Sequence, residues 1–249
     1  MIIRDERGGV RVLRLAHGKV SAMDLELCEA IIGELNAARD GDPRAVVITG
    51  TGSSFSAGVD LFRVIKDGAA YGTRFLPVLD GMLRAALTFP KPLVAAVNGH
   101  AIAGGCILAA ACDHRVMADG AGRIGVPELI VGVPFPALPL EIMAARVPAS
   151  ALRELVYTGH IVQVDEAIVK GLADEKCAAD QLVDRACVVA QRLASIPASA
   201  FALTKETFYS PILIRVSQMA DLNARVVDAW KQQATYDAIR AYLERTVRK

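Results

Sequence analysis

The sequence predicts an α/β protein with a helical C-terminal region, and three observations carry that prediction. The short apolar stretches AVVITG (45–50) and LVAAVNG (93–99) have the length and composition of buried strands. Each leads into a glycine-containing loop and then into a helical segment, and this alternation indicates layers of sheet and helix. Beyond Pro148 the strand patterns almost vanish, and helical patterns follow one another.

The first elements along the chain are a hairpin and a helix. Residues 10–15 (VRVLRL) alternate as a half-buried strand does, and the ERGG before them has the composition of a turn that joins them to an apolar pair at 2–3. Apolar residues recur at helical spacing from Asp24 to Arg39. The Asp, Gly and Pro residues within 40–43 end that helix.

Two further strands and a series of helices complete the predicted fold. We expect strands at 114–118 (HRVMA) and near Ile124. Helices are expected at about 149–157, 165–170, 180–195, 199–209 and 215–247. Asp165 and Gly171 suit the N-cap and the C-cap of the second of these helices. The change of pattern places a boundary near Gly159, between a core of residues 1–159 and a helical region of residues 160–249.

Composition and charge narrow the functional classes. The 249 residues are 53% hydrophobic and 22% charged, which is enough to build a substantial core. Lys plus Arg number 28 against 27 for Asp plus Glu, so electrostatics gives no support for a nucleic-acid partner. The longest apolar runs fall far below the roughly 20 residues of a membrane span, and the N-terminus lacks the apolar core of a signal peptide. We therefore expect a cytoplasmic protein with neither nucleic acid nor a membrane as a partner.

The cysteines, histidines and glycine-rich loops match no common metal or cofactor motif. The five cysteines are odd in number and include no C-x-x-C, so buried free thiols are expected. The four histidines share no metal-like spacing with one another or with nearby carboxylates, and no metal site is predicted. GTGSSFSAG fails the dinucleotide and hydrolase-nucleophile patterns, and GHAIAGG has Gly105 where a phosphate-binding loop needs lysine.

Two glycine turns point to backbone amides as functional groups. A helix that begins at Gly104 presents unpaired N–H groups and the positive end of its dipole, and glycine lets a ligand approach closely. The stretch FSAGVD offers a second such turn, because Ala57 and Gly58 precede an expected helix start at Asp60. Such amides suit a developing oxyanion. Taken alone, each turn can equally be a tight connection between strand and helix.

Four ordered stretches together resemble one known family. FSAGVD, FPKPLVAAVNGHAIAGGC, CDHRVMAD and IGVPELIVGVPFP resemble the crotonase superfamily, also called the enoyl-CoA hydratase/isomerase family. The resemblance runs from about Lys19 to about Glu175. It implies that residues 1–159 form a spiral of ββα turns and that residues 160–249 join subunits into a homotrimer or a dimer of trimers. It also implies an acyl-CoA thioester substrate and no cofactor, since coenzyme A is part of the substrate.

The resemblance assigns roles residue by residue. In the family two backbone amides hold the thioester oxygen while an enolate forms, and these amides correspond to Ala57 and Gly104. Substrate contacts correspond to Val20, Ala22, Gly58, Val59, Asp60, Gly105, Ile107 and Phe135. Ser21 replaces an asparagine of the family pattern between the first two of these. Phe135 and the prolines around it replace family glycines, so a reshaped acyl pocket is expected.

Glu128 is the predicted catalytic residue. Family hydratases carry two glutamates, and this sequence keeps only the second, as Glu128 in VPELIVG, while Ile107 occupies the first position. Hydration is most readily served by two carboxylates, whereas moving a double bond needs one base that removes a proton and returns it elsewhere. The resemblance therefore favours conversion of a 3-enoyl-CoA into a 2-enoyl-CoA. An apolar setting beside Ile107 should raise the pKa of Glu128.

Three alternatives stay open from the sequence alone. Glu128 can be read as an ordinary exposed carboxylate at a helix start after Pro127. The protein can be an enoyl-CoA hydratase that forms 3-hydroxyacyl-CoA, with Glu128 alone or with a further acid such as Glu141. It can also be a non-catalytic acyl-CoA-binding relative that lost turnover with the carboxylate at position 107. Trp230, Tyr236 and Tyr242 are interpreted as packing residues.

Overall fold

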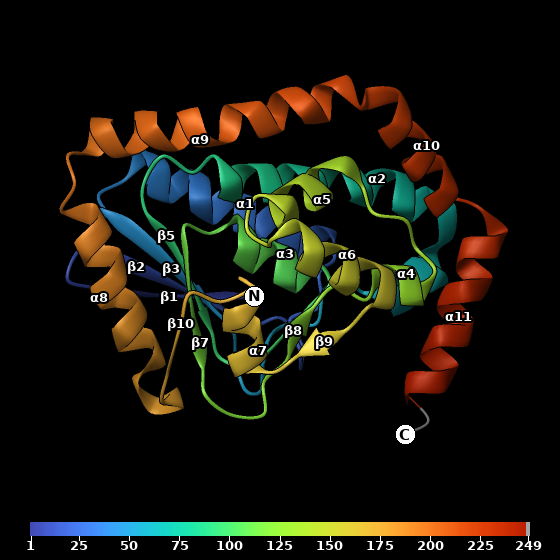
Figure 1. The fold of residues 1–249 in the computed structure, drawn as a ribbon, viewed down its shortest axis with the longest axis horizontal. Coiled ribbons are helices and arrows are strands. Elements are labelled where there is room, and N and C mark those ends of the chain that lie inside the picture. Colours follow the sequence, from blue (N-terminus) through green and yellow to red (C-terminus); the bar gives the residue numbers. More distant parts are fainter. Residues whose placement is uncertain (248–249) are drawn as a thin grey trace.

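The protein contains two β-sheets and eleven α-helices within residues 1–247, which are the residues that the computed structural model describes (Figure 1). The larger sheet has the strand order β1 (Ile2–Arg7), β2 (Val10–Leu15), β3 (Ala45–Thr49), β5 (Leu93–Val97), β7 (His114–Ala118) and β10 (Glu175–Cys177). β1 and β2 form the predicted antiparallel hairpin, with Gly8 and Gly9 both at positive φ in its turn, and the other pairs are parallel. The four predicted strands at 10–15, 45–50, 93–99 and 114–118 are confirmed.

The smaller sheet takes part in a structural repeat of two strands and a helix. Its strand order is β4 (Ser54–Ser56), β6 (His100–Ile102), β8 (Ile124–Gly125) and β9 (Ile161–Val162). Three times in succession the chain forms a strand of the larger sheet, then a strand of the smaller sheet, then a helix. The helices of these three turns are α2 (Leu61–Leu87), α3 (Gly104–Ala111) and α4 (Glu128–Val131). This is the predicted spiral of ββα turns.

Four of the other helices lie where the sequence predicted helices, at 24–39, 149–157, 165–170 and 180–195. Asp24 caps α1 (Leu25–Asp40) by accepting from the Leu27 amide, in agreement with the predicted helix at 24–39. The remaining helices are α5 (Ala137–Ala144), α6 (Ala149–Thr158), α7 (Val164–Val169), α8 (Leu182–Ala194), α9 (Ala198–Gln218), α10 (Ala220–Trp230) and α11 (Gln233–Val247). A 3₁₀ turn, η1 (Ala179–Gln181), precedes α8.

Two details of the C-terminal prediction are wrong. A single helix over 215–247 was expected, but α9 continues to Gln218 and the chain then bends twice, at Met219 and after Trp230, to form α10 and α11. The second bend is closed by the Thr235 hydroxyl, which donates to the Ala229 carbonyl over 2.7 Å. In α7 the N-cap is Gln163, and Asp165 lies within the first turn.

The region beyond Gly159 contributes strands as well as helices. β9 pairs with β8, and β10 pairs with β7, so both sheets include a strand from residues 160–249. These strands have two and three residues, too few to show a period in the sequence. The division into a core of 1–159 and a helical region of 160–249 stays a prediction. Within the described residues no single helix could cross a membrane, and only the strongly bent pair α8 and α9 together has the length and composition for one.

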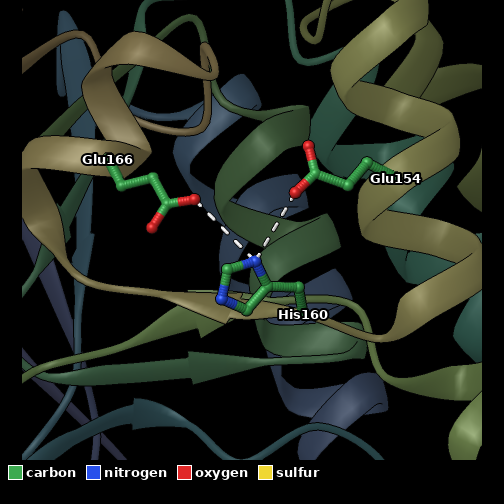
Figure 2. A group of neighbouring side chains, drawn as sticks. All are labelled: Glu154, His160 and Glu166. Carbon is green, nitrogen blue, oxygen red and sulfur yellow. Dashed lines mark ion pairs between the residues drawn. The ribbon is translucent and has the colours of Figure 1, made fainter.

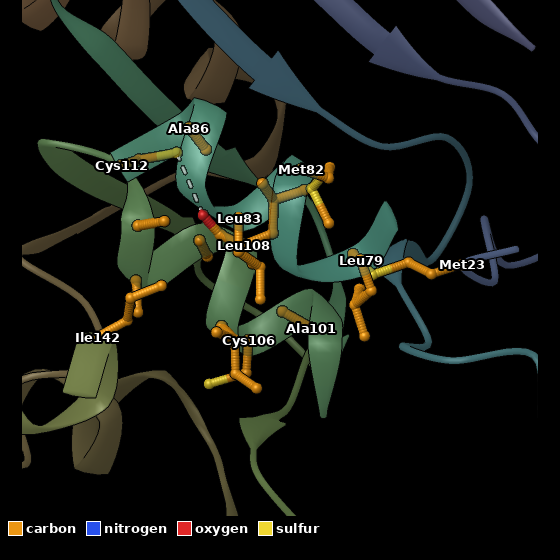
Figure 3. Packing of buried hydrophobic residues seen from close by; sticks show 14 of the residues in the cluster. Met23, Leu79, Met82, Leu83, Ala86, Ala101, Cys106, Leu108, Cys112 and Ile142 are labelled. Carbon is orange, nitrogen blue, oxygen red and sulfur yellow. Dashed lines mark hydrogen bonds between the residues drawn. The ribbon is translucent and has the colours of Figure 1, made fainter. Parts of the chain in front are cut away.

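Helix α3 lies at the centre of the larger apolar core. All eight of its residues are buried, because α2 and α5 pack on it from two sides. Figure 3 shows Leu79, Met82 and Leu83 of α2 and Ile142 of α5 around Leu108 of α3. A separate apolar layer forms between α8 and the opposite face of the larger sheet. The helix that begins at Gly104 is therefore held rigidly, which matters for the amides at its start.

Candidate active site

The ends of α2, α3 and α4 that meet the smaller sheet border one pocket. Its walls are Ala57, Val59, Leu61, Leu79, Leu83, Ile102, Ala103, Gly104, Ile107, Pro127, Glu128, Val131, Val133, Phe135, Pro136, Pro139, Trp230 and Tyr242. Val59, Gly104 and Glu128 each follow the end of a strand of the smaller sheet, in three successive ββα turns. Because β4, β6 and β8 are parallel neighbours, their carboxyl ends bring these three residues together.

The amide of Gly104 is one free donor at this pocket. Gly104 is the first residue of α3, and its N–H has no acceptor among residues 1–247. A Cβ atom at this position would lie 2.9 Å from the Met23 sulfur, so a larger residue would have to displace the buried Met23 side chain. The preceding Ala103 has φ 51° and ψ −123°, a region that residues other than glycine rarely adopt. The buried α3 holds this conformation in place.

The structure corrects the prediction for Ala57. Its amide already donates to the Val20 carbonyl over 3.0 Å, so it is not available to a ligand oxygen. Two residues further on, the Gly58 carbonyl and the Asp60 amide both bond to Met23 and leave the Val59 N–H between them without an acceptor among the described residues. The second free donor at the pocket is therefore the amide of Val59.

The amides of Val59 and Gly104 lie close to each other. A Cβ atom placed on Gly58 would be 3.1 Å from the Gly104 nitrogen, and one placed on Gly104 would be 3.9 Å from the Val59 nitrogen. Gly58 has φ 78° and its added Cβ would also lie 2.6 Å from the Ile102 carbonyl oxygen, so only glycine fits between the two turns. Two adjacent N–H groups can stabilise one oxygen that acquires negative charge.

The predicted substrate-contact residues fall into two groups. Val59, Ile107 and Phe135 line the pocket. Val20, Ala22, Gly58, Asp60 and Gly105 do not line it. Asp60 caps α2 by accepting from the Arg63 amide over 2.9 Å, and a Cβ at Gly105 would lie 2.4 Å from the Ser56 carbonyl oxygen. These two residues fix the turns on which the free amides lie.

Glu128 is buried in the pocket wall. Its exposed fraction is 8%, which contradicts the interpretation as an exposed carboxylate at a helix start. Burial raises the pKa of Glu128 to about 8, and its buried Oε2 atom has no hydrogen-bond partner in the described part of the chain. The short helix α4 ends at Gly132, whose left-handed conformation directs two amide–carbonyl bonds back to Glu128. A carboxyl group with this pKa can exchange a proton near neutral pH.

Within the described residues that line the pocket, Glu128 is the one acid. Ile107 lies in the same wall and is 3% exposed, so this position offers only hydrocarbon. Glu141, the other acid considered from the sequence, does not line the pocket and pairs with Arg215 over 2.7 Å. The pocket walls thus combine two free amides, one carboxyl group and an apolar surface.

Sequence reasoning missed two aromatic residues of the site. Trp230 of α10 and Tyr242 of α11 line the pocket, although both were interpreted as packing residues. The Trp230 indole N–H donates to the Pro134 carbonyl over 3.1 Å. Tyr236, the third aromatic residue of this region, is buried but does not line the pocket. No sequence signal connects Trp230 to Glu128, because about a hundred residues and five α-helices, α5 to α9, separate them.

A cluster of ionisable groups around one of the four histidines lies elsewhere on the surface. His160 Nδ1 lies 3.7 Å from Glu154 and 3.8 Å from Glu166 (Figure 2). Lys170 pairs with both glutamates, over 2.6 and 3.5 Å, and its hydrogen bond lowers the pKa of Glu154. The ammonium group compensates one of the two carboxylate charges, so the cluster is an ion-pair network between α6 and α7.

Comparison with known proteins places these features in context. A family model for enoyl-CoA hydratase/isomerase matches residues 5–248. A Thermus thermophilus protein whose name provisionally assigns it to the enoyl-CoA hydratases is 35% identical over 228 residues, which cover 90% of this chain and 88% of that protein. A Mycobacterium tuberculosis protein, named an enoyl-CoA isomerase for one solved structure and a probable enoyl-CoA hydratase for another, is similar in structure, with 30% identity, a TM-score of 0.78 and coverage of 96% and 97% of the two chains. The human mitochondrial Δ3-Δ2-enoyl-CoA isomerase shares the fold, with a TM-score of 0.94 at 23% identity over 99% and 98% of the chains.

Proposed function

The chain belongs to the enoyl-CoA hydratase/isomerase family, and from that premise we propose that it converts 3-enoyl-CoA thioesters into 2-enoyl-CoA thioesters. The observation that carries the proposal is that Glu128 is the one acid among the described residues lining the pocket, with Ile107 in the same wall. Shifting a double bond needs a single group that accepts and returns one proton.

The proposed reaction has two steps. The Glu128 carboxylate removes a proton from C2 of the substrate, and the C–H electron pair moves into the thioester to form a dienolate. The Glu128 carboxyl group then returns the proton to C4, the C2=C3 double bond forms and the thioester carbonyl is restored. No other reactant is consumed, because the proton that leaves C2 is the one that arrives at C4.

The negative charge of the dienolate is on the thioester oxygen, and we assign its stabilisation to the amides of Val59 and Gly104. Both nitrogens lie at the pocket and are free of intramolecular acceptors among residues 1–247. The loss of one such donor typically costs roughly 3 kcal/mol of transition-state stabilisation. The buried apolar walls strengthen this interaction, because little water competes for the oxygen.

Hydration of a 2-enoyl-CoA is the second candidate, favoured by the name of the Thermus thermophilus relative. The two reactions separate when 3-hexenoyl-CoA and crotonyl-CoA are supplied to the protein one at a time. We expect the conjugated thioester to accumulate from 3-hexenoyl-CoA, while crotonyl-CoA persists. Rapid loss of crotonyl-CoA with formation of a 3-hydroxyacyl-CoA would overturn the proposal in favour of hydration.

Glu128→Gln tests whether the protein is an enzyme at all. The amide keeps the size of the side chain but cannot carry a proton, so we expect turnover to fall by at least about a thousandfold while acyl-CoA binding persists. Glu141→Gln is the matched control, because Glu141 pairs with Arg215 outside the pocket, and its rate should stay within a few-fold of the wild type. Binding with no turnover in all three proteins would support a non-catalytic role instead.

We also propose a homotrimer or a dimer of trimers, joined through the C-terminal helices. In support, α9 runs along one edge of the molecule and exposes Leu203, Phe208 and Ile214, whose exposed fractions are 63%, 73% and 56% (Figure 1). Large apolar side chains exposed along one helix suit a protein interface. Light scattering of Phe208→Asp should show a smaller mass than the wild type, and a wild-type monomer would contradict the proposal.

A further inference from the structure

The pocket walls restrict the chemistry of the acyl chain. Apart from Glu128, the described side chains that line the pocket offer only two polar groups, the Tyr242 hydroxyl and the Trp230 indole N–H. The indole already bonds to the Pro134 carbonyl. A hydroxyl, carboxylate or amine on the acyl chain would lose its hydration without gaining comparable partners. The pocket therefore fits an unsubstituted hydrocarbon chain.

The pocket has half-buried walls, which include Phe135, Pro136 and Tyr242, and one fully buried wall. Ala57, Val59 and Leu61, on the side of the free amides, are half-buried. Leu83, Val133 and Trp230 are buried, with exposed fractions of 0%, 3% and 5%. A thioester held at the Val59 and Gly104 amides would have its bulky coenzyme A part toward the half-buried side. Its acyl chain would extend toward the buried wall.

Trp230 closes that buried wall and is fixed in place. Its indole N–H holds the Pro134 carbonyl over 3.1 Å, and Asn223 of the same helix accepts from the Ala137 amide over 3.0 Å. α10 is therefore attached at two points, to Pro134 between α4 and α5 and to the first residue of α5. A side chain anchored in this way cannot rotate aside without breaking the hydrogen bond to Pro134.

We propose that Trp230 sets the length of the longest acyl chain that the pocket accepts. The inference rests on the proposed function, because it takes the thioester to lie at the Val59 and Gly104 amides. An acyl chain that ends before the indole gains apolar contact, and therefore binding affinity, with each carbon added. The affinity stops rising at the chain length that reaches the indole.

Trp230 is the single tryptophan of the chain, so its fluorescence reports directly on the floor of the pocket in the unmodified protein. The probes are coenzyme A and saturated acyl-CoAs of increasing length, each at a saturating concentration. We expect coenzyme A and acetyl-CoA to leave the indole emission unchanged. The emission should shift from a particular chain length onward, and calorimetry should show the affinity levelling off at that same length.

Variants test the wall itself. Trp230→Leu removes most of the ring, so chains about two methylenes beyond the wild-type limit should bind more tightly, by about fourfold for each methylene that becomes buried. Trp230→Phe loses the bond to Pro134 but keeps an aromatic wall, and its length limit should stay near that of the wild type. Tyr236→Phe is the matched control, because Tyr236 is buried nearby without lining the pocket, and its profile should be unchanged.

The outcomes separate this inference from the proposed function. Acyl-CoA binding without any response of the Trp230 emission, or an unchanged length limit in a folded Trp230→Leu protein, would overturn the role of Trp230 and leave the proposed reaction standing. Failure to bind any acyl-CoA would overturn the proposed function and this inference with it. If Trp230→Leu does not fold, the fluorescence titration of the wild type decides.

Discussion

The amide of Ala57 donates to the carbonyl of Val20 over 3.0 Å, and this bond determines which amides face the pocket. It ties the turn before α2 to the segment that precedes α1. The two polar groups that flank Val59 are bonded to Met23: the Gly58 carbonyl accepts from the Met23 amide, and the Asp60 amide donates to the Met23 carbonyl. The amide of Val59 is left as the one in this turn that a ligand oxygen can reach.

Replacement of single amides by esters distinguishes the two residues. A Val59 residue introduced as its α-hydroxy acid keeps the side chain and loses the N–H, and we expect the rate constant kcat to fall by about 10²–10³-fold. The same change at Ala57 removes its bond to Val20, so it should lower the free energy of unfolding by about 1 kcal/mol and leave kcat within a few-fold. Steady-state kinetics and urea unfolding measure both. A larger loss of kcat at Ala57 than at Val59 would show that the assignment is reversed.

The pH dependence of the reaction should follow Glu128. Burial raises the pKa of this carboxyl group to about 8, and the proposed first step needs the carboxylate. For the free protein, kcat/KM should therefore rise about tenfold for each pH unit below about 8 and level off above it. Initial rates with 3-hexenoyl-CoA measure this profile at each pH between 5 and 10 at which the protein is folded. A flat profile, or one that falls over this range, would mean that another group removes the proton.

The same carboxyl group should make the protein less stable at high pH. Its pKa is raised from 4.5 in the unfolded chain to about 8 in the folded one, so the folded state retains a proton that the unfolded state has lost. The contribution to the free energy of unfolding is fully present below pH 4.5 and is lost as the pH rises through about 8, by on the order of 4 kcal/mol. Glu128→Gln removes this loss. The variant should match the wild type near pH 4.5 and be clearly more stable at pH 9 in urea unfolding, whereas equal stabilities at pH 9 would show that the carboxyl group is not desolvated.

Sequence patterns were sufficient to predict the strands and helices that are buried against a neighbouring sheet or helix. The apolar strands at 45–50 and 93–99 and the helix after Asp24 were predicted because burial imposes a period or an apolar run on their residues. β9 and β10 are too short to carry such a pattern. No glycine or proline marks the bends that separate α9, α10 and α11 in the sequence, because the residues at these bends, Met219 and Lys231, are ordinary helix residues.

The residues of the candidate site were predictable only where the type of side chain determines the function of the residue. Glu128 and Ile107 were identified because a carboxyl group and a hydrocarbon side chain differ in the chemistry that they permit. The choice between the Ala57 and Val59 amides depends on the direction in which each N–H points, and residue identity does not encode that direction. The place of Trp230 depends on how α10 folds back onto the segment after α4, which is a property of the tertiary structure alone.

Each of Val59, Gly104 and Glu128 lies just after a short strand of the smaller sheet, yet the helices that follow range from 4 and 8 residues in α4 and α3 to 27 in α2, which is kinked at Gly68. Hydrogen bonds between β4, β6 and β8 fix the spacing of the three strand ends, so helix length is free to differ without disturbing it. Insertions and deletions in the helices can thus remodel the cavity during evolution while the reacting groups keep their alignment. A fold of this kind can come to accept different acyl groups while the groups that carry out the reaction stay the same.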